Sequence, residues 1–300
     1  MKKQFLLAVG VLTVFIGAKG QKPDTALLMV HYKFTHVWDT TNRARPDSEN
    51  MVLFVGKIAS AYRSYDGLVA DQQFKKAYEA MTASSPDGRP LINRRGIGTP
   101  TRYYQYPNEQ KLLIKENLVV NQYLIEGAMP VIKWKISGDT ATFGGLHCQK
   151  ATGHFKGRDY IVWFCPDLPV HTGPWKLNGL PGVIVDAHDT KNEVVFKFDG
   201  VEKVVPSPPK SKPIAANTDE KDRAPMLRGL DEDPNLIVPP ASLTKTTQKE
   251  FDKLKDAIIK NPDAFAQSIN NQNAGKNAPR VVMKAEGDIT INNPIELPEK

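Results

Sequence analysis

Between Thr101 and Val205 the chain is a succession of short segments rich in aromatic and β-branched residues, each ended by a turn signal. The segments expected to be strands are 101–106, 110–115, 118–125, 131–136, 139–143, 146–153, 158–165, 182–188 and 193–199. The turn signals between them include Pro107-Asn108-Glu109, Ser137-Gly138-Asp139, Lys156-Gly157 and Asp189-Thr190-Lys191-Asn192. Connections this short favour antiparallel neighbours, because a parallel pair needs a much longer crossover. The sequence therefore predicts a mainly β (α+β) fold, an antiparallel meander sheet or half-open barrel with one or two packing helices.

The segments before this region predict a hairpin and a helix. Residues 26–37 and 51–60 are expected to form an opening β-hairpin, joined by a polar turn over 39–50. A helix is expected over 71–82, where Phe74, Tyr78 and Met81 recur at helical spacing and Asp71 is a suitable N-cap.

After Pro206 the composition changes. Residues 206–240 hold eight prolines among many charges, which predicts an irregular Pro-rich excursion. An amphipathic helix is expected near 246–260, with strands at 280–283 and 288–295. Because the last strand could return to the main sheet, we favour a single β-rich domain over 21–300 rather than two domains.

The first twenty residues have the three parts of a secretory signal. Lys2 and Lys3 precede an apolar stretch over 5–16, and Ala18-Lys19-Gly20 places small residues before a cleavage point. The apolar stretch is shorter than the ~20 residues that span a bilayer. We expect residues 1–20 to be a signal peptide, with Gln21 as the new N-terminus and the periplasm as the destination; secretion or association with the outer membrane is the alternative.

Charge and hydropathy narrow the class of partner. The full chain carries +7, and residues 1–20 hold three lysines and no acid, so the mature chain carries +4. The basic residues do not form an obvious stripe, so nucleic-acid binding is not expected. No later apolar run approaches membrane-spanning length, and we expect no transmembrane segment in the mature chain.

The two cysteines, Cys148 and Cys165, lie on successive predicted strands joined by the turn at Lys156-Gly157. Glycine allows the positive φ that a two-residue hairpin turn requires. This turn places Cys148 opposite Cys165 in a non-hydrogen-bonded pair, whose Cα atoms lie ~4.5 Å apart. That distance is within the disulfide range, and exported proteins meet an oxidising compartment. We therefore expect a disulfide, with two free buried thiols as the alternative.

One segment combines glycines, prolines and a tryptophan. Its motif residues are Gly173, Pro174, Trp175, Gly179, Leu180, Pro181 and Gly182. Proline fixes φ, and glycine adopts values closed to other residues. The pattern predicts a rigid motif loop, pinned by Trp175 and Leu180, that leads into a strand. It lacks the lysine-serine ending of a phosphate-binding loop and contains no nucleophile.

The motif loop resembles the signature of the GLPGLI family of exported bacterial envelope proteins, with Val183 at the fifth position. Other segments also resemble the family: His147-Cys148-Gln149-Lys150-Ala151-Thr152, Phe155-Lys156-Gly157-Arg158, Trp163-Phe164, Pro166-Asp167-Leu168-Pro169, Met51–Ser60 and Asn293-Pro294-Ile295-Glu296-Leu297. The resemblance implies an envelope location in Gram-negative bacteria and a largely β structure. It implies no established activity, so it supplies no catalytic residues.

Candidate chemical groups are few. Asp186 and His188 share one face of a predicted strand, but a metal needs three or four converging ligands, so no metal site is expected. His147 points away from Cys148, which argues against joint ligation. Residues 103–106, Tyr-Tyr-Gln-Tyr, could line a groove, although strand aromatics more often cover a core. We predict no catalytic residue and no cofactor.

These observations lead to three functional hypotheses. The first is a non-enzymatic envelope protein that binds a ligand or an envelope partner, in association with outer-membrane transport. The second is a lipid or lipoprotein carrier with an apolar pocket in a half-barrel. The third is an envelope hydrolase or metal-dependent enzyme whose site is assembled from distant residues.

Overall fold

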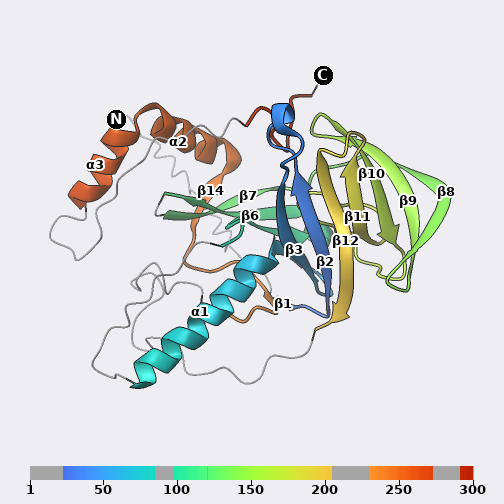
Figure 1. Cartoon of the computed structure of the whole chain (residues 1–300), viewed down its shortest axis with the longest axis horizontal. Helices are drawn as coiled ribbons and strands as arrows, with labels where there is room; N and C mark the ends of the chain where they lie inside the picture. Colours follow the sequence, from blue (N-terminus) through green and yellow to red (C-terminus); the bar gives the residue numbers. More distant parts are fainter. Residues whose placement is uncertain are drawn as a thin grey trace, which may run out of the picture.

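The computed structural model describes residues 23–84, 97–119, 121–204, 230, 232–272 and 291–299. Its centre is a twelve-stranded open sheet with the order β14-β7-β6-β5-β4-β3-β2-β12-β11-β10-β9-β8 (Figure 1). The outermost strands, β14 and β8, do not pair with each other. The predicted mainly β class with packing helices is therefore confirmed, as an open sheet rather than a closed barrel.

Two antiparallel meanders make up the sheet. The first contains β2 (Leu28–His36), β3 (Asp47–Val55), β4 (Ser60–Ser64), β5 (Arg102–Tyr106), β6 (Lys111–Leu118) and β7 (Asn121–Ala128). The second contains β8 (Trp134–Phe143), β9 (Leu146–Phe155), β10 (Arg158–Cys165), β11 (Val183–Asp189) and β12 (Val194–Lys203). The two meanders join where β12 pairs antiparallel with β2. This pairing brings together strands more than 150 residues apart, and no local sequence signal predicts it.

The remaining elements lie at the margins of the sheet. They are β1 (Asp24–Thr25), paired with β13 (Leu236–Ile237), β14 (Thr244–Thr247), α2 (Gln248–Lys260), α3 (Pro262–Gln272) and two single 3-10 turns over Thr40–Asn42 and Pro107–Glu109. Strand β14 runs parallel to β7, so one edge departs from the expected antiparallel pattern. Helix α2 begins at a capping box between Thr247 and Glu250, close to the expected start of the helix near 246–260.

Helix α1 (Tyr65–Ser84) is longer than the helix expected over 71–82. It begins directly after β4, because the hydroxyl of Ser64 accepts a hydrogen bond from the backbone N–H of Gly67 at 2.8 Å. Ser64 therefore supplies the cap expected from Asp71. The helix packs against β3, with Leu68 and Phe74 buried.

Two strand boundaries were predicted wrongly. The segment expected as one strand over 51–60 is divided between β3 and β4, because Asp24 accepts hydrogen bonds from the backbone of Ile58 and Ala59 and holds a turn there. Conversely, residues 134–136 of the strand expected over 131–136 and the strand expected over 139–143 belong to the single strand β8, which begins at Trp134. The predicted turn over 137–139 is a bulge in that strand, where the register shifts between Ile136 and Thr140.

The C-terminal segment 291–299 is not a strand, although a strand was expected over 288–295. Side chains hold it instead: Arg158 donates to Asn293 Oδ1 at 2.7 Å and to the Pro294 carbonyl at 2.8 Å. The predicted signal peptide over 1–20, the strand at 280–283 and most of the excursion over 206–240 lie outside the described residues.

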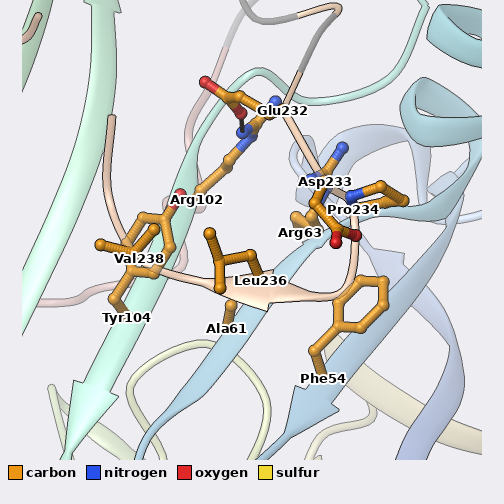
Figure 2. Close-up of a pocket in the computed structure, with 10 residues that line it drawn as sticks. All are labelled: Phe54, Ala61, Arg63, Arg102, Tyr104, Glu232, Asp233, Pro234, Leu236 and Val238. Carbon is orange, nitrogen blue, oxygen red and sulfur yellow. Dashed lines mark hydrogen bonds and ion pairs between the residues drawn. The ribbon is translucent and has the colours of Figure 1, made fainter. Parts of the chain in front are cut away.

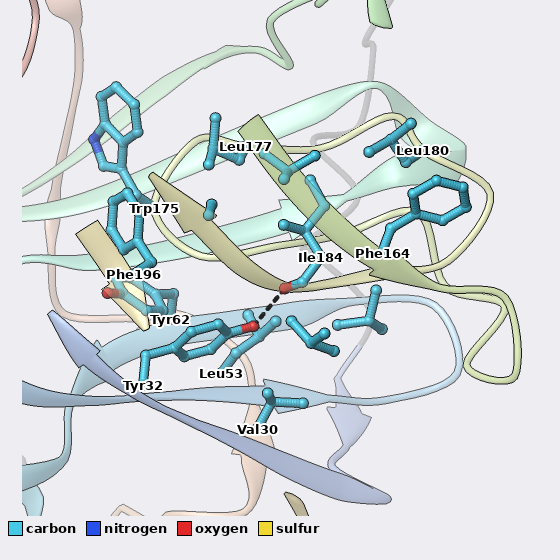
Figure 3. Packing of buried hydrophobic residues seen from close by; sticks show 14 of the residues in the cluster. Val30, Tyr32, Leu53, Tyr62, Phe164, Trp175, Leu177, Leu180, Ile184 and Phe196 are labelled. Carbon is cyan, nitrogen blue, oxygen red and sulfur yellow. Dashed lines mark hydrogen bonds between the residues drawn. The ribbon is translucent and has the colours of Figure 1, made fainter. Parts of the chain in front are cut away.

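Both faces of the sheet bury apolar side chains. On one face the motif loop covers the sheet, so that Trp175, Leu177 and Leu180 belong to the same cluster as Val30 and Leu53 (Figure 3). In this cluster the Tyr32 hydroxyl donates to the Ile184 carbonyl at 2.6 Å. The opposite face carries a second cluster, which contains Val52, Phe54, Ala61, Tyr104, Leu113, Ile237 and Leu68 of α1. Strand β3 contributes to both clusters and is therefore the centre of the core.

Among the described helices, none is long and apolar enough to span a membrane.

Candidate functional site

The motif loop singled out by the sequence is part of the core. Trp175, Leu177 and Leu180 are all at most 2% exposed. The side chain of Gln105 on β5 holds the loop, because its Nε2 donates to the carbonyl oxygens of Gly173, Trp175 and Leu177 at 3.3, 3.0 and 3.3 Å. The side chains of the motif loop therefore fill the fold rather than line an open site.

Gly182 ends the motif loop where the backbone comes close to β10. A Cβ atom at this position would lie 2.1 Å from the Cys165 carbonyl oxygen, well inside van der Waals contact. Only glycine fits this approach. The glycine therefore determines how the motif loop enters β11.

The hairpin predicted around the cysteines is confirmed, but the disulfide is not formed. Arg158 pairs with Phe155 and Phe164 with Gln149, so the register is the expected one, and Lys156 and Gly157 both have positive φ. Cys148 and Cys165 are nevertheless free and buried. The last pair of the ladder is Phe164–Gln149, one residue short of the cysteines. The Cys148 thiol donates to the Leu146 carbonyl at 3.6 Å, and the two cysteine side chains also interact with each other without a covalent bond.

The other sequence candidates do not assemble into a chemical site. Asp186 is buried, accepts one hydrogen bond from the backbone N–H of Phe198 and forms an ion pair with Lys197, whereas His188 pairs across the sheet with Val195. No group of three His, Cys, Asp or Glu side chains in the described part of the chain could hold a metal ion. The tyrosine run over 103–106 is mostly core, although Tyr104 lines a pocket described below.

A groove of about 900 Å³ lies between the start of β3, helix α1 and the segment 97–100. Its residues are Trp38, Asp47, Ser48, Glu49, Asn50, Tyr65, Asp66, Val69, Ala70, Gln73, Ile97, Gly98, Thr99 and Pro100. Three of them are carboxylates and none is basic. We call this surface the acidic groove.

Backbone and polar side chains fix two of the three carboxylates of the acidic groove. Glu49 accepts hydrogen bonds from the backbone N–H and the hydroxyl of Thr99 at 2.7 and 2.5 Å. Asp66 accepts from the backbone N–H and the side-chain amide of Asn50 at 3.0 and 2.9 Å. Within the described ranges no lysine, arginine or histidine forms an ion pair with Asp47, Glu49 or Asp66. The negative charge of the groove is therefore uncompensated there.

Two aromatic rings complete the acidic groove. Tyr65 packs edge-on against His31, and Trp38 packs against His36, which hold both rings in place. The indole Nε1 of Trp38 is buried and has no hydrogen-bond partner among the residues that the structure describes. The groove thus combines fixed carboxylates with the faces of two aromatic rings.

A second, smaller pocket lies on the face of the sheet that carries α1. Its volume is about 120 Å³, and its residues are Phe54, Ala61, Arg63, Arg102, Tyr104, Glu232, Asp233, Pro234, Leu236 and Val238 (Figure 2). A neighbouring cavity of about 180 Å³ shares Arg63, Glu232 and Pro234 with it and extends to Leu68 and Gln72 of α1. We call the two together the Arg63 pocket.

The two arginines of the Arg63 pocket have different surroundings. Arg102 forms an ion pair with Glu232 at 2.7 Å. Burial alone would lower the pKa of Arg102. The nearby Tyr104 and Glu232 side chains have a larger effect, and the pKa of Arg102 is raised. Arg63 has no ion pair or hydrogen bond with any described residue. Its pKa is lowered to about 10, mainly by burial and to a smaller extent by the positive charge of Arg102.

Sequence reasoning did not identify either the acidic groove or the Arg63 pocket. A signal was present for Arg63, which interrupts the apolar strand segment Ala61-Tyr62-Arg63 at a position that shares its face with Ala61. For the acidic groove, Asp47 and Glu49 come from strand β3 and Asp66 from helix α1, so no single sequence motif unites the three carboxylates.

No family model matches the sequence, and no curated protein is similar to it. Among solved structures, one of PNGF-II in space group P21 is similar, with 11% identity over 76% of this chain and 32% of that chain and a TM-score of 0.46. Another, of PNGF-II in space group C2, has 11% identity over 75% of this chain and 32% of that chain, with a TM-score of 0.44. The chain thus spans 32% of the length of these structures.

Proposed function

We propose that this chain is an exported, non-enzymatic envelope protein of the GLPGLI type, and that its acidic groove binds a basic segment of an envelope partner. The observation that carries the proposal is the set of three carboxylates, Asp47, Glu49 and Asp66, which face a large groove with no described counter-ion. The signal-like residues 1–20 and the motif loop support the envelope location.

The chemistry of the acidic groove favours an organic cation over a metal ion. The three carboxylates do not form a group that could hold a metal. A lysine or arginine side chain can pair with a carboxylate and lie over an aromatic ring, and Trp38 and Tyr65 supply such rings. A groove of about 900 Å³ accommodates several side chains of an extended segment.

The core favours this function over an apolar carrier. A carrier needs an open apolar cavity against the sheet, whereas here Trp175, Leu177 and Leu180 of the motif loop occupy that face. A recognition surface at the margin of the sheet is compatible with such a filled core. The association with an outer-membrane transporter remains part of the proposal, because a transporter is one envelope protein that could supply a basic segment.

The test is calorimetric titration of the mature protein, residues 21–300, with a pentapeptide that contains two arginines. The matched probe is the same peptide with both arginines replaced by citrulline, which keeps the shape and removes the charge. We expect saturable binding of the arginine peptide that weakens with salt, because exposed charge pairs are screened. Asp47→Asn and Asp66→Asn should each weaken binding about two- to fivefold.

The matched control is Asp139→Asn, an exposed carboxylate on the edge strand β8. It should leave the affinity for the peptide unchanged. Equal binding of the arginine and citrulline peptides, or an equal effect of all three substitutions, would contradict recognition of a basic segment by the acidic groove. Mass spectrometry of periplasmic fractions tests export separately, because it should recover a chain that starts at Gln21.

A further inference from the structure

The Arg63 pocket lies apart from the acidic groove and is built by different side chains. Strand pairing sets Arg63 opposite Val52, and Ala61 opposite both Phe54 and Tyr104. These side chains project on the same face of the sheet, where the segment over 232–238 crosses them (Figure 2). The pocket floor is apolar, and the guanidinium of Arg63 stands at the junction with the neighbouring cavity.

The charge of Arg63 is the unexplained feature of this pocket. Arg63 is half-buried, so its charge is partly dehydrated without gaining an ion pair from a described residue. The nearby arginine already has its counter-ion, since Arg102 is paired with Glu232. The carboxylates of Glu232 and Asp71 act on Arg63 only over a longer distance than an ion pair. The guanidinium of Arg63 is therefore available to pair with an anion that enters the pocket.

The surroundings of Arg63 define which anion fits. A guanidinium donates in a planar fork that matches the two oxygens of a carboxylate. The aromatic ring of Phe54 and the side chains of Leu236 and Val238 offer an apolar surface to the rest of the ligand. The carboxylate of Asp233, which also lines the pocket, opposes a ligand with several negative charges, such as phosphate.

We propose that the Arg63 pocket binds a small organic acid with one carboxylate and a short apolar body. The carboxylate pairs with the guanidinium of Arg63, and the apolar body contacts Phe54, Leu236 and Val238. The Arg102–Glu232 ion pair lines the same pocket beside Tyr104 and carries no net charge. This inference is independent of peptide binding at the acidic groove.

The test is calorimetric titration of the mature protein with butyrate at constant ionic strength, beside butyramide and inorganic phosphate. We expect saturable binding of butyrate and at least tenfold weaker binding of both other probes. Arg63→Met should reduce the affinity for butyrate at least tenfold, and Arg63→Lys should reduce it by a smaller factor because it keeps the charge and loses the fork. Arg43→Met, an exposed arginine at another part of the surface, should leave butyrate binding unchanged.

Thermal unfolding separates a binding effect from misfolding. Because the charge of Arg63 has no described partner, Arg63→Met should leave the unliganded Tm unchanged or raise it, and butyrate should raise the Tm of the unaltered protein only. The proposal is overturned if the protein does not bind butyrate, if phosphate or butyramide binds as tightly, or if Arg63→Met binds butyrate normally. It is also overturned if Arg63→Met lowers the unliganded Tm, because Arg63 would then be a structural residue.

Discussion

The side-chain amide of Gln105 donates a hydrogen bond to the carbonyl oxygen of Trp175 at 3.0 Å, inside the core. The same nitrogen also reaches the carbonyls of Gly173 and Leu177, and the Gln105 oxygen accepts from the hydroxyl of Thr172 at 2.8 Å. A buried loop has backbone carbonyls that no strand satisfies, and Gln105 satisfies three of them. One polar side chain on a strand thus fixes a motif loop that lies seventy residues further along the chain.

Replacement of Gln105 by leucine should destabilise the fold strongly. Leucine keeps a similar volume but leaves the three carbonyls unsatisfied, at a cost of about 2–4 kcal/mol in the free energy of unfolding. Urea unfolding followed by circular dichroism measures the change. Gln267→Leu, at an exposed position of α3, is the control and should change stability by no more than about 0.5 kcal/mol. Similar values for the two variants would show that Gln105 does not hold the motif loop.

The approach of Gly182 to Cys165 gives a second prediction. Gly182→Ala places a methyl group against a backbone oxygen that cannot move alone, so we expect a loss of about 3 kcal/mol or more. Gly138→Ala is the matched control, because no atom lies within 4 Å of the added Cβ. Its stability should be unchanged within about 0.5 kcal/mol. A tolerated alanine at 182 would mean that the motif loop can enter β11 by another path.

Arg158 links the sheet to the C-terminal segment. Its guanidinium pairs with Asp189 at 2.7 Å and Glu193 at 3.2 Å, and all three side chains are at most 4% exposed. Arg158→Gln leaves the buried Asp189 carboxylate without its cation and Glu193 with Arg43 alone, so we expect a loss of about 3–5 kcal/mol. Hydrogen exchange over 291–299 should also become faster, because Asn293 loses its donor.

The control for Arg158 is Lys150→Gln, which removes an exposed pair with Asp139. It should change stability by about 0–1 kcal/mol and leave exchange over 291–299 unaltered. If Arg158→Gln destabilises the fold without changing exchange in that segment, the arginine stabilises the sheet alone.

The free energy of unfolding should decrease in two ranges as the pH is lowered. Burial lowers the pKa of His36 below its ordinary value of 6.5, although its hydrogen bond to the Asn293 carbonyl raises it in part. Below about pH 6.5, His36 is therefore protonated in the unfolded chain but still neutral in the folded protein. Protonation then favours the unfolded chain, and the free energy of unfolding decreases. Burial would raise the pKa of Glu193, but the hydrogen bonds from Arg43 and Arg158 outweigh it and keep this pKa below the ordinary 4.5. The contribution of the ionised Glu193 carboxylate to the free energy of unfolding is complete above about pH 4.5 and is lost as the pH falls below that value.

Urea unfolding between pH 7 and pH 4 measures this dependence. His36→Gln can still donate to the Asn293 carbonyl and should remove the decrease between pH 7 and pH 5. His147→Gln is the matched control at a solvent-exposed histidine and should leave the decrease in place. Because the raised pKa of His154 acts in the opposite direction, the comparison is between variants: a profile that His36→Gln leaves unchanged would contradict the neutral, buried state of His36.

The two thiols should be unreactive in the folded protein. Burial, with a smaller effect of Cys165, raises the pKa of the Cys148 thiol to about 12, and burial also raises that of Cys165. Because the thiolate is the reactive form, a thiol reagent at pH 8 should modify neither cysteine until the chain unfolds. Unfolding without reductant should then release two thiols. Release of none would show that the protein carries the disulfide that the register allows.

The sequence alone was sufficient for the local features of the sheet. Strands β9 and β10 and the turn at Lys156-Gly157 follow from alternation and from turn chemistry, which act between near neighbours. The rigid motif loop follows from its glycines and prolines in the same way. Boundaries failed where a distant side chain intervened, as when Asp24 holds the turn at 56–59.

Only the tertiary structure decided what these elements do. The pairing of β12 with β2, the burial of Trp175 under Gln105 and the docking of Asn293 on Arg158 join residues far apart in the chain. Such contacts depend on how the whole chain buries its apolar surface, and no local pattern encodes them. For the same reason the motif loop, the most distinctive segment of the sequence, is core, whereas the acidic groove and the Arg63 pocket are assembled from residues that the sequence leaves apart.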